Sequence, residues 1–174
     1  MTSKNHIVET QRTLVSRIEL NDALFFVRLV NTEDWLKYIG NRNVENAEDA
    51  RRFLENGFLK SYNDHGFGYY VIRMQQDRQP IGICGFLKKD YLDNPDFGFA
   101  LLPEFYGQGL ALEACQSVLE YGFRTFGFKM LDAVTLPENA PSMRLLERLE
   151  FQRKGLVALP GDDRELLLFR RQID

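Results

Sequence analysis

The residues whose types and spacing most clearly suggest a binding site form a short glycine loop, Gly107-Gln108-Gly109, between a predicted strand and a predicted helix. Apolar residues run from Phe97 to Leu102 and stop at Pro103, a pattern typical of a buried strand. From Ala111 to Phe126 the apolar residues recur at helical spacing. The first N–H groups of a helix lack intrahelical partners and lie at the positive end of its dipole. Because glycine also lets a phosphate approach the main chain, this loop could bind an anion.

Other interpretations of the two glycines must be weighed against phosphate binding. They could serve the geometry of a tight turn alone. A P-loop requires a lysine directly after its second glycine, but no lysine occurs between Lys89 and Lys129. A dinucleotide fingerprint requires a third glycine where Leu112 stands, and too few residues follow to complete a doubly wound domain, although Asp132 lies near the expected distance. Turn geometry and phosphate binding both remain open on spacing alone.

Two motifs resemble those of the GCN5-related N-acetyltransferase superfamily. The segment Tyr106-Gly107-Gln108-Gly109-Leu110-Ala111, followed by Glu113-Ala114, is similar to the acetyl-CoA pyrophosphate loop Gln/Arg-x-x-Gly-x-Gly/Ala. Tyr106 departs from the Gln/Arg position, but an aromatic residue there is usual in the branch that acetylates the N-termini of ribosomal proteins. Downstream, Asn139-Ala140-Pro141-Ser142 and Leu145 to Phe151 resemble that branch's Asn-x-x-Ser-x-x-x-Leu-Glu-Lys-Leu-Gly-Phe signature. The resemblance spans nearly the whole chain.

The resemblance implies an N-acetyltransferase that moves the acetyl group of acetyl-CoA directly to a primary amine, with acetyl-CoA as co-substrate and no metal. The acceptor would be a protein or peptide N-terminus or a small-molecule amine. Backbone N–H groups near Leu101 and Leu102 would hold the pantetheine arm and the thioester carbonyl, while Asn139 and Ser142 would face the thiol end. The residues expected to bind the cofactor are Leu101, Leu102, Tyr106, Gly107, Gln108, Gly109, Leu110, Ala111, Asn139 and Ser142.

Three residues are candidates for catalysis: Asp96, Asn139 and Ser142. Related enzymes often carry a glutamate at the position of Asp96, and a carboxylate there could take the amine's proton through water, although it could also be a solvated turn residue. Asn139 could equally cap its helix, and Ser142 has no motif-linked histidine to make it an acyl-enzyme nucleophile. Related enzymes often use a tyrosine as general acid where this chain has Leu146. Its absence motivates an alternative function, a non-catalytic module that binds or senses acyl-CoA.

The expected acceptor-binding residues are Trp35, Tyr38, Arg42 and His65. The first three belong to a predicted irregular segment, Trp35 to Asn46, which in the resembled family lies over the acceptor site. Trp35 could instead anchor this segment in the core. His65 lies in a glycine-flanked turn, where it could be structural or contact the substrate. An α-amine, with a pKa near 8, needs less help to become neutral than a lysine side chain, so a site without a strong base favours α-amines.

The elements that must position these residues form one mixed α/β domain over residues 1–174, with a loose tail at 1–11. Its expected fold has a mostly antiparallel central sheet, a splayed parallel strand pair and flanking helices, the acyl-CoA N-acyltransferase fold. The strand-helix-strand order around the loop predicts the parallel pair. Besides these elements, the sequence predicts a strand at 13–18, helices at 21–30 and 46–65, a hairpin of 67–74 with 80–87, a strand at 131–136, a helix from Pro141 and a hairpin of 151–159 with 165–169.

Composition limits the partners and the compartment. The chain has 174 residues, of which 44% are apolar and 27% charged, as in ordinary globular domains. A net charge of −3 gives no basic footprint for nucleic acid. Cys84 and Cys115 lie in apolar segments and form no metal or redox pair by spacing, which predicts buried thiols in a reducing compartment. With a polar start and no membrane-spanning run, we expect a cytoplasmic monomer or homodimer.

Overall fold

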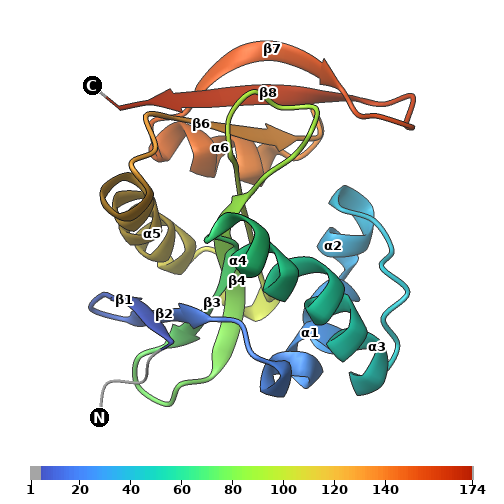
Figure 1. Ribbon diagram of the computed structural model, residues 1–174, viewed down its shortest axis with the longest axis vertical. Helices are drawn as coiled ribbons and strands as arrows, with labels where there is room; N and C mark the ends of the chain where they lie inside the picture. Colours follow the sequence, from blue (N-terminus) through green and yellow to red (C-terminus); the bar gives the residue numbers. More distant parts are fainter. Residues whose placement is uncertain (1–4, 174) are drawn as a thin grey trace.

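The computed structural model describes residues 5–173, and its centre is an eight-stranded sheet with the order β1-β2-β3-β4-β5-β6-β8-β7 (Figure 1). The neighbouring strands are antiparallel except for β5 and β6, which run parallel. This arrangement confirms the predicted mixed sheet with one parallel pair. The strands are β1 (His6–Glu9), β2 (Thr13–Arg17), β3 (Tyr69–Met74), β4 (Pro80–Leu87), β5 (Asp96–Leu101), β6 (Met130–Thr135), β7 (Gln152–Ala158) and β8 (Glu165–Gln172).

Helices cover both faces of the sheet (Figure 1). Helices α5 and α6 contribute to one buried apolar cluster, and α1, α2 and α3 contribute to a second. Successive side chains of a strand point to opposite faces, so Tyr70 and Ile72 join the first cluster while Val71 joins the second. The helices are α1 (Ala23–Val30), α2 (Glu33–Tyr38), α3 (Ala47–Leu54), α4 (Lys60–His65), α5 (Leu110–Phe126) and α6 (Ala140–Arg148).

The predicted helix from Asn46 to His65 is confirmed as a continuous helical segment, but it is not uniform. A π-helical turn, Glu55–Leu59, joins α3 to α4. The segment begins where the Asn46 side chain accepts a hydrogen bond from the Asp49 N–H, at 3.0 Å. It ends at Gly66, which has a left-handed conformation with φ of 78°.

Three expectations need correction. The tail predicted at 1–11 is partly ordered, because His6–Glu9 pair with β2 as strand β1; residues 1–4 lie outside the described residues. Residues 33–38 form the short helix α2, whose single turn and a half is too short for a periodic pattern to stand out. Cys84 and Cys115 are buried as predicted, but the fold brings the two thiols into contact, and burial raises the pKa of the Cys115 thiol.

Across residues 5–173, the structure contains no helix that is both long enough and apolar enough to span a membrane.

The Asn46 cap gives a direct test of the local structure that positions α3. Replacing Asn46 by Ala should lower the free energy of unfolding by about 1 kcal/mol, because the Asp49 N–H loses its acceptor. Replacing Asn46 by Ser should retain most of the stability, since a hydroxyl can accept the same bond. Chemical denaturation of the two variants measures this difference. Equal stability of Asn46→Ala and the natural protein would contradict the assigned cap.

Candidate functional site

A cavity of about 930 Å³ opens along β5 and β6 and extends from the α1–α2 connection to the start of α6. Strand β5 supplies a continuous part of its wall, from Asp96 to Leu101. The glycine loop lines it through Gly107 and Gly109. Residues predicted from separate parts of the sequence therefore meet around one space.

The cavity exists because the parallel strands β5 and β6 separate soon after they begin. Their register contains a single pair, Asp96 with Asp132. A hydrogen bond from the Asp132 N–H to the Pro95 carbonyl, at 3.0 Å, joins the two strands there. Asp132 is itself held by Arg170, whose Nε lies 2.6 Å from Asp132 Oδ1. The strands are thus anchored at one end and free to diverge toward the other.

The register of β5 shows which of its backbone groups face the opening. The Leu102 N–H donates to the Ile81 carbonyl on the β4 side, at 2.8 Å. Backbone groups alternate in direction along a strand, so the N–H groups of Phe99 and Leu101 point toward β6. In the described part of the chain, the β5–β6 ladder has no register partner for either residue. The Leu101 N–H is therefore oriented toward the opening, while the expectation that the Leu102 N–H is a donor there is wrong because it is already bonded to the Ile81 carbonyl.

The glycine loop ends at an uncapped helix. Gly107 and Gly109 have φ values of 72° and 76°, so both glycines are required by the turn. The first bond of α5 runs from the Glu113 N–H to the Gly109 carbonyl, and no side chain of the described residues caps this end. The N–H groups of Leu110 to Leu112 precede that bond, and these residues line the cavity. The glycines therefore serve the geometry of the turn, and the helix that follows them also presents N–H groups without intrahelical partners.

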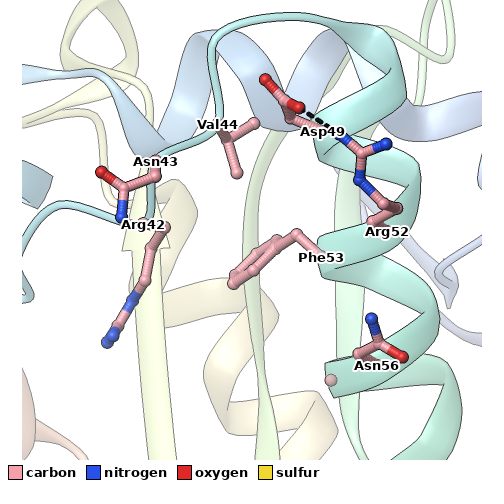
Figure 2. Close-up of a pocket in the computed structure, with 8 residues that line it drawn as sticks. Arg42, Asn43, Val44, Asp49, Arg52, Phe53 and Asn56 are labelled. Atoms are coloured by element: carbon pink, nitrogen blue, oxygen red, sulfur yellow. Dashed lines mark hydrogen bonds and ion pairs between the residues drawn. The ribbon is translucent and has the colours of Figure 1, made fainter.

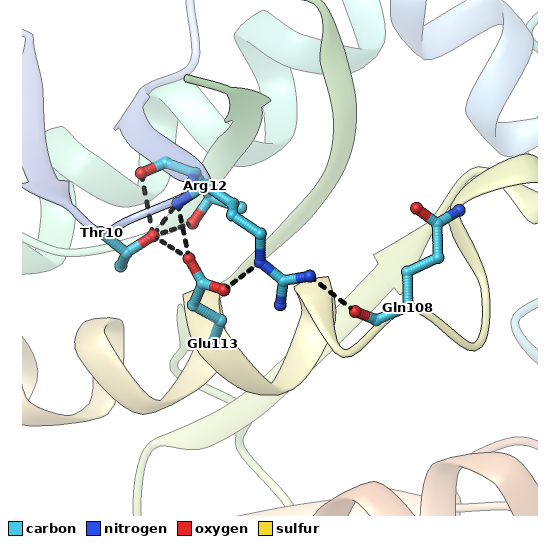
Figure 3. Close-up of polar contacts among 5 residues, drawn as sticks. Thr10, Arg12, Gln108 and Glu113 are labelled. Atoms are coloured by element: carbon cyan, nitrogen blue, oxygen red, sulfur yellow. Dashed lines mark hydrogen bonds and ion pairs between the residues drawn. The ribbon is translucent and has the colours of Figure 1, made fainter. Parts of the chain in front are cut away.

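Arg12, which connects β1 to β2, fastens the loop to the N-terminal hairpin (Figure 3). Its Nε donates to Glu113 Oε2 at 2.7 Å, and its Nη1 donates to the Gln108 carbonyl at 2.9 Å. The Thr10 hydroxyl donates to Glu113 Oε1 at 2.6 Å. These bonds hold the loop and the first turn of α5 in one position. The Gln108 side chain bonds to the Glu104 carbonyl and does not line the cavity, so Gln108 supports the loop through its main chain.

Asp96 is a buried carboxylate beside a lysine that the sequence did not indicate. It is 2% exposed, and its Oδ2 lies 2.9 Å from Lys89 Nζ. Burial raises the pKa of Asp96 to about 6, and the Lys89 charge opposes that rise. Its Oδ1 is buried without a hydrogen-bond partner among the described residues. A solvated turn residue would have none of these properties, so the structure excludes that interpretation of Asp96.

The helical connection from α1 to α3 supplies the far end of the cavity. Trp35, Tyr38 and Arg42 line it, as predicted. Trp35 is 5% exposed, and within residues 5–173 its indole N–H has no hydrogen-bond partner. Tyr106 lies near the same end, where burial and the neighbouring Asp34 carboxylate raise its pKa.

His65 does not reach the cavity; it is exposed at the end of α4 and stacks on Phe67, 5.8 Å away between ring centroids.

A second hollow, of about 570 Å³, lies beside this end of the cavity (Figure 2). Arg42 and Phe53 line both spaces, so the two hollows are neighbours. Its remaining walls come from the loop (Asn43, Val44), from α3 (Asp49, Arg52) and from the π-helical turn (Asn56, Gly57), and Arg52 donates to Asp49. Within residues 5–173, the Arg42 guanidinium makes one hydrogen bond, a long one of 3.4 Å to the Ile39 carbonyl. The surface around it is therefore mixed in polarity and open.

The second predicted motif forms the start of α6. Asn139 Oδ1 accepts a hydrogen bond from the Ser142 N–H at 3.2 Å, so Asn139 caps the helix. Both residues also line the cavity, so the cap does not exclude a second role. Leu146 is buried and lines the cavity as well, which leaves no phenol at this position.

Several cavity residues were missed by sequence reasoning. Lys89 and Tyr91 lie in the connection between β4 and β5, and Tyr69 begins β3. The sequence pattern predicted that Tyr69 belongs to a hairpin. It did not indicate that the Tyr69 side chain extends across the sheet to β5. The pair of Lys89 with Asp96 spans a turn whose geometry the sequence does not specify.

Comparisons with known proteins agree with this geometry. A model of the acetyltransferase (GNAT) domain family matches residues 12–152. An uncharacterised N-acetyltransferase, p20 of Bacillus licheniformis, is 29% identical over 149 residues, which cover 85% of this chain and 83% of p20.

Solved structures share the fold at lower identity. A ribosomal-protein-S5-alanine acetyltransferase from Vibrio fischeri is 18% identical with a TM-score of 0.78, and the match covers 95% of each chain. RimL, a ribosomal L7/L12 α-N-protein acetyltransferase solved with coenzyme A, is 18% identical with a TM-score of 0.78, covering 97% of this chain and 98% of RimL. Because the family model spans most of the chain and the cavity joins both motifs, the chain belongs to the GNAT family of acetyl-CoA-dependent acetyltransferases.

Proposed function

We propose that this acetyltransferase transfers the acetyl group of acetyl-CoA directly to the α-amine of a peptide or protein N-terminus. The observation that carries this proposal is the second hollow, which adjoins the acceptor end of the cavity through Arg42 and Phe53. A small amine would need only the cavity, whereas a polypeptide needs space for the residues that follow its amine. The ribosomal-protein acetyltransferases among the solved structures of this fold agree with a protein acceptor.

Acetyl-CoA would be held mainly by backbone groups. The N–H groups of Leu110, Ala111 and Leu112, at the positive end of α5, would bind the pyrophosphate. The N–H groups of Phe99 and Leu101 would bind the pantetheine arm and the thioester carbonyl where β5 diverges from β6. A carbonyl bound to fixed donors becomes more electrophilic as negative charge develops on its oxygen. Asn139 and Ser142 remain the residues assigned to the thiol end.

Asp96 would be the general base. At neutral pH a carboxyl group with a pKa of about 6 is largely ionised and can accept a proton. An α-amine with a pKa near 8 is neutral in about one molecule in ten at pH 7, whereas a lysine side chain is neutral in fewer than one in a thousand. The modest basicity of Asp96 therefore suits an α-amine better than a lysine. Trp35, Tyr38 and Arg42 would contact the acceptor.

A panel of acceptors tests the class of substrate. Peptides with a free N-terminus should be acetylated with higher kcat/KM than the same peptides blocked at the N-terminus and carrying an internal lysine. Shortening a peptide to a single amino acid amide should reduce kcat/KM, because the second hollow is then left empty. Release of CoA thiol measures each reaction. A small-molecule amine that outperforms every peptide would overturn the proposed acceptor class.

Two variants of Gly109 separate phosphate binding from turn geometry. Gly109→Asp and Gly109→Asn place side chains of nearly equal size at a left-handed residue, so both carry similar backbone strain. Only the Asp variant puts a negative charge beside the N–H groups of α5. We expect its dissociation constant for acetyl-CoA to exceed that of the Asn variant at least tenfold, by calorimetry. An acetyl donor truncated to pantetheine, which lacks the pyrophosphate, should bind both variants equally. Equal acetyl-CoA affinity would leave the glycines with a purely geometric role.

The pKa of Asp96 predicts the pH dependence of the reaction. Because burial raises that pKa to about 6, Asp96 is protonated below this pH and cannot accept a proton. With a peptide acceptor, kcat/KM should fall about tenfold per unit below pH 8 as the amine protonates, and about a hundredfold per unit below pH 6. Asp96→Asn should lower kcat/KM at pH 7 by roughly two orders of magnitude and abolish the steeper limb. A profile that is unchanged in shape and height would show that Asp96 is not the base.

A further inference from the structure

The side chain of Tyr69, on β3, crosses β4 and ends over β5. In the sheet register, Tyr69 pairs with Gly85 of β4, and Gly85 pairs with Gly98 of β5. A Cβ atom added to Gly98 would lie 1.9 Å from the Tyr69 hydroxyl oxygen. The hydroxyl therefore occupies the space in which a side chain at position 98 would lie. A tyrosine from β3 thus supplies the functional group that β5 lacks at this point.

This hydroxyl belongs to the cavity and is not used by the fold. Both Tyr69 and Gly98 line the cavity. Within residues 5–173, the Tyr69 hydroxyl makes no hydrogen bond to another residue. Burial and the nearby Asp96 charge raise the pKa of Tyr69, so the phenol keeps its proton at neutral pH. A neutral hydroxyl offers two acceptor lone pairs as well as one donor.

Asp96 presents its carboxylate on the same side of the sheet. Side chains two residues apart on a strand share a face, so Asp96 and the hydroxyl over Gly98 are neighbours along β5. Strand geometry puts the Cα atoms of Asp96 and Gly98 about 7 Å apart. At that spacing, one small group between them can bond to the Asp96 carboxylate and to the Tyr69 hydroxyl oxygen. Asp96 Oδ1 is buried and has no hydrogen-bond partner among the described residues, so an N–H group bound in the cavity would satisfy it.

We propose that Tyr69 is a catalytic residue that holds the acceptor nitrogen together with Asp96. A primary amine has two N–H bonds and a lone pair. One N–H would donate to Asp96 Oδ1 and the other to the Tyr69 oxygen, which directs the lone pair toward the thioester carbonyl on the open stretch of β5. This inference rests on the assignment of Asp96 under the proposed function, but it holds for any primary amine.

The step balances without a covalent change at Tyr69. The nitrogen lone pair forms the N–C bond, the C–S bond breaks, and the sulfur leaves with the electron pair. The nitrogen gives one proton to Asp96 and keeps its bond to Tyr69. An N-methyl amine has one N–H fewer and cannot satisfy both oxygens. Tyr69 would therefore select primary over secondary amines.

The competing explanation is that Tyr69 only covers two glycines of the sheet. The variant Tyr69→Phe keeps the ring and removes the hydroxyl, and Tyr70→Phe is its matched control, because Tyr70 points to the opposite face and into the core. We expect Tyr69→Phe to lower kcat/KM roughly 10- to 100-fold with the best acceptor of the panel, without changing the melting temperature or the dissociation constant for acetyl-CoA. Tyr70→Phe should leave kcat/KM unchanged.

Substrate preference gives a readout that a purely structural role would not alter. The natural enzyme should prefer a primary amine over its N-methyl counterpart at least tenfold, and in Tyr69→Phe this preference should largely disappear. Wild-type kcat/KM in Tyr69→Phe, or an unchanged preference in that variant, would overturn the proposal. If the best acceptor is a small amine, the peptide proposal fails while this test still applies.

A double-mutant cycle with Gly98 covers the case in which Tyr69→Phe is difficult to interpret. Gly98→Ala should displace the hydroxyl and lower kcat/KM in the natural enzyme. In the Tyr69→Phe background the methyl group no longer meets the hydroxyl oxygen and meets only the ring, whose Cζ lies 2.9 Å away, so Gly98→Ala should cause a smaller loss. Such coupling between the two positions supports the proposal. Fully additive losses would show that the hydroxyl over Gly98 does not contribute to catalysis.

Discussion

The divergence of β5 from β6 is the constraint on which the functional part of this structure depends. Parallel strands in a complete ladder would bond every backbone group between them and leave no space for a ligand. Here the ladder is reduced to the Asp96–Asp132 position, and the hydrogen bond that Arg170 donates to Asp132 fixes that end against β8. The other end opens into the cavity and exposes donors on β5. The same divergence thus supplies both the space and the groups that bind within it.

The site combines rigid backbone donors with few ionised side chains. Arg12 and Glu113 hold the glycine loop from outside the cavity, so the N–H groups of α5, the proposed pyrophosphate site, lie in a fixed arrangement. Asp96 differs from these backbone donors because it is an ionisable side chain. Its carboxylate is buried and forms an ion pair with Lys89. Burial that would destabilise an unpaired charge here raises the pKa of this carboxyl group to about 6, a value suited to a base near neutral pH. In the proposed function, such a modest base and fixed positioning act together on an amine that is partly neutral.

Local signals in the sequence predicted the parts of the site that lie within one segment. The glycine loop with its helix, the helix that begins at Asn46, the cap at Asn139 and the parallel pair around the loop follow from spacing and residue type. Features that join distant segments could not be predicted in this way. Arg12 contacts Gln108 across 96 residues, and Tyr69 reaches Gly98 only because two strand registers align. The error at Leu102 has the same origin, since the direction of an N–H along a strand is known only once its neighbour is paired.

In the proposed function, the N–H groups of Phe99 and Leu101 face an opening that acetyl-CoA fills. Amide hydrogen exchange, resolved by residue with and without acetyl-CoA, tests it directly. Exchange at Phe99 and Leu101 should slow markedly on binding, whereas exchange at Leu102 should change little, because its N–H is already bonded to the Ile81 carbonyl. Equal protection of all three amides, or no change at Phe99 and Leu101 in the presence of saturating acetyl-CoA, would contradict the account.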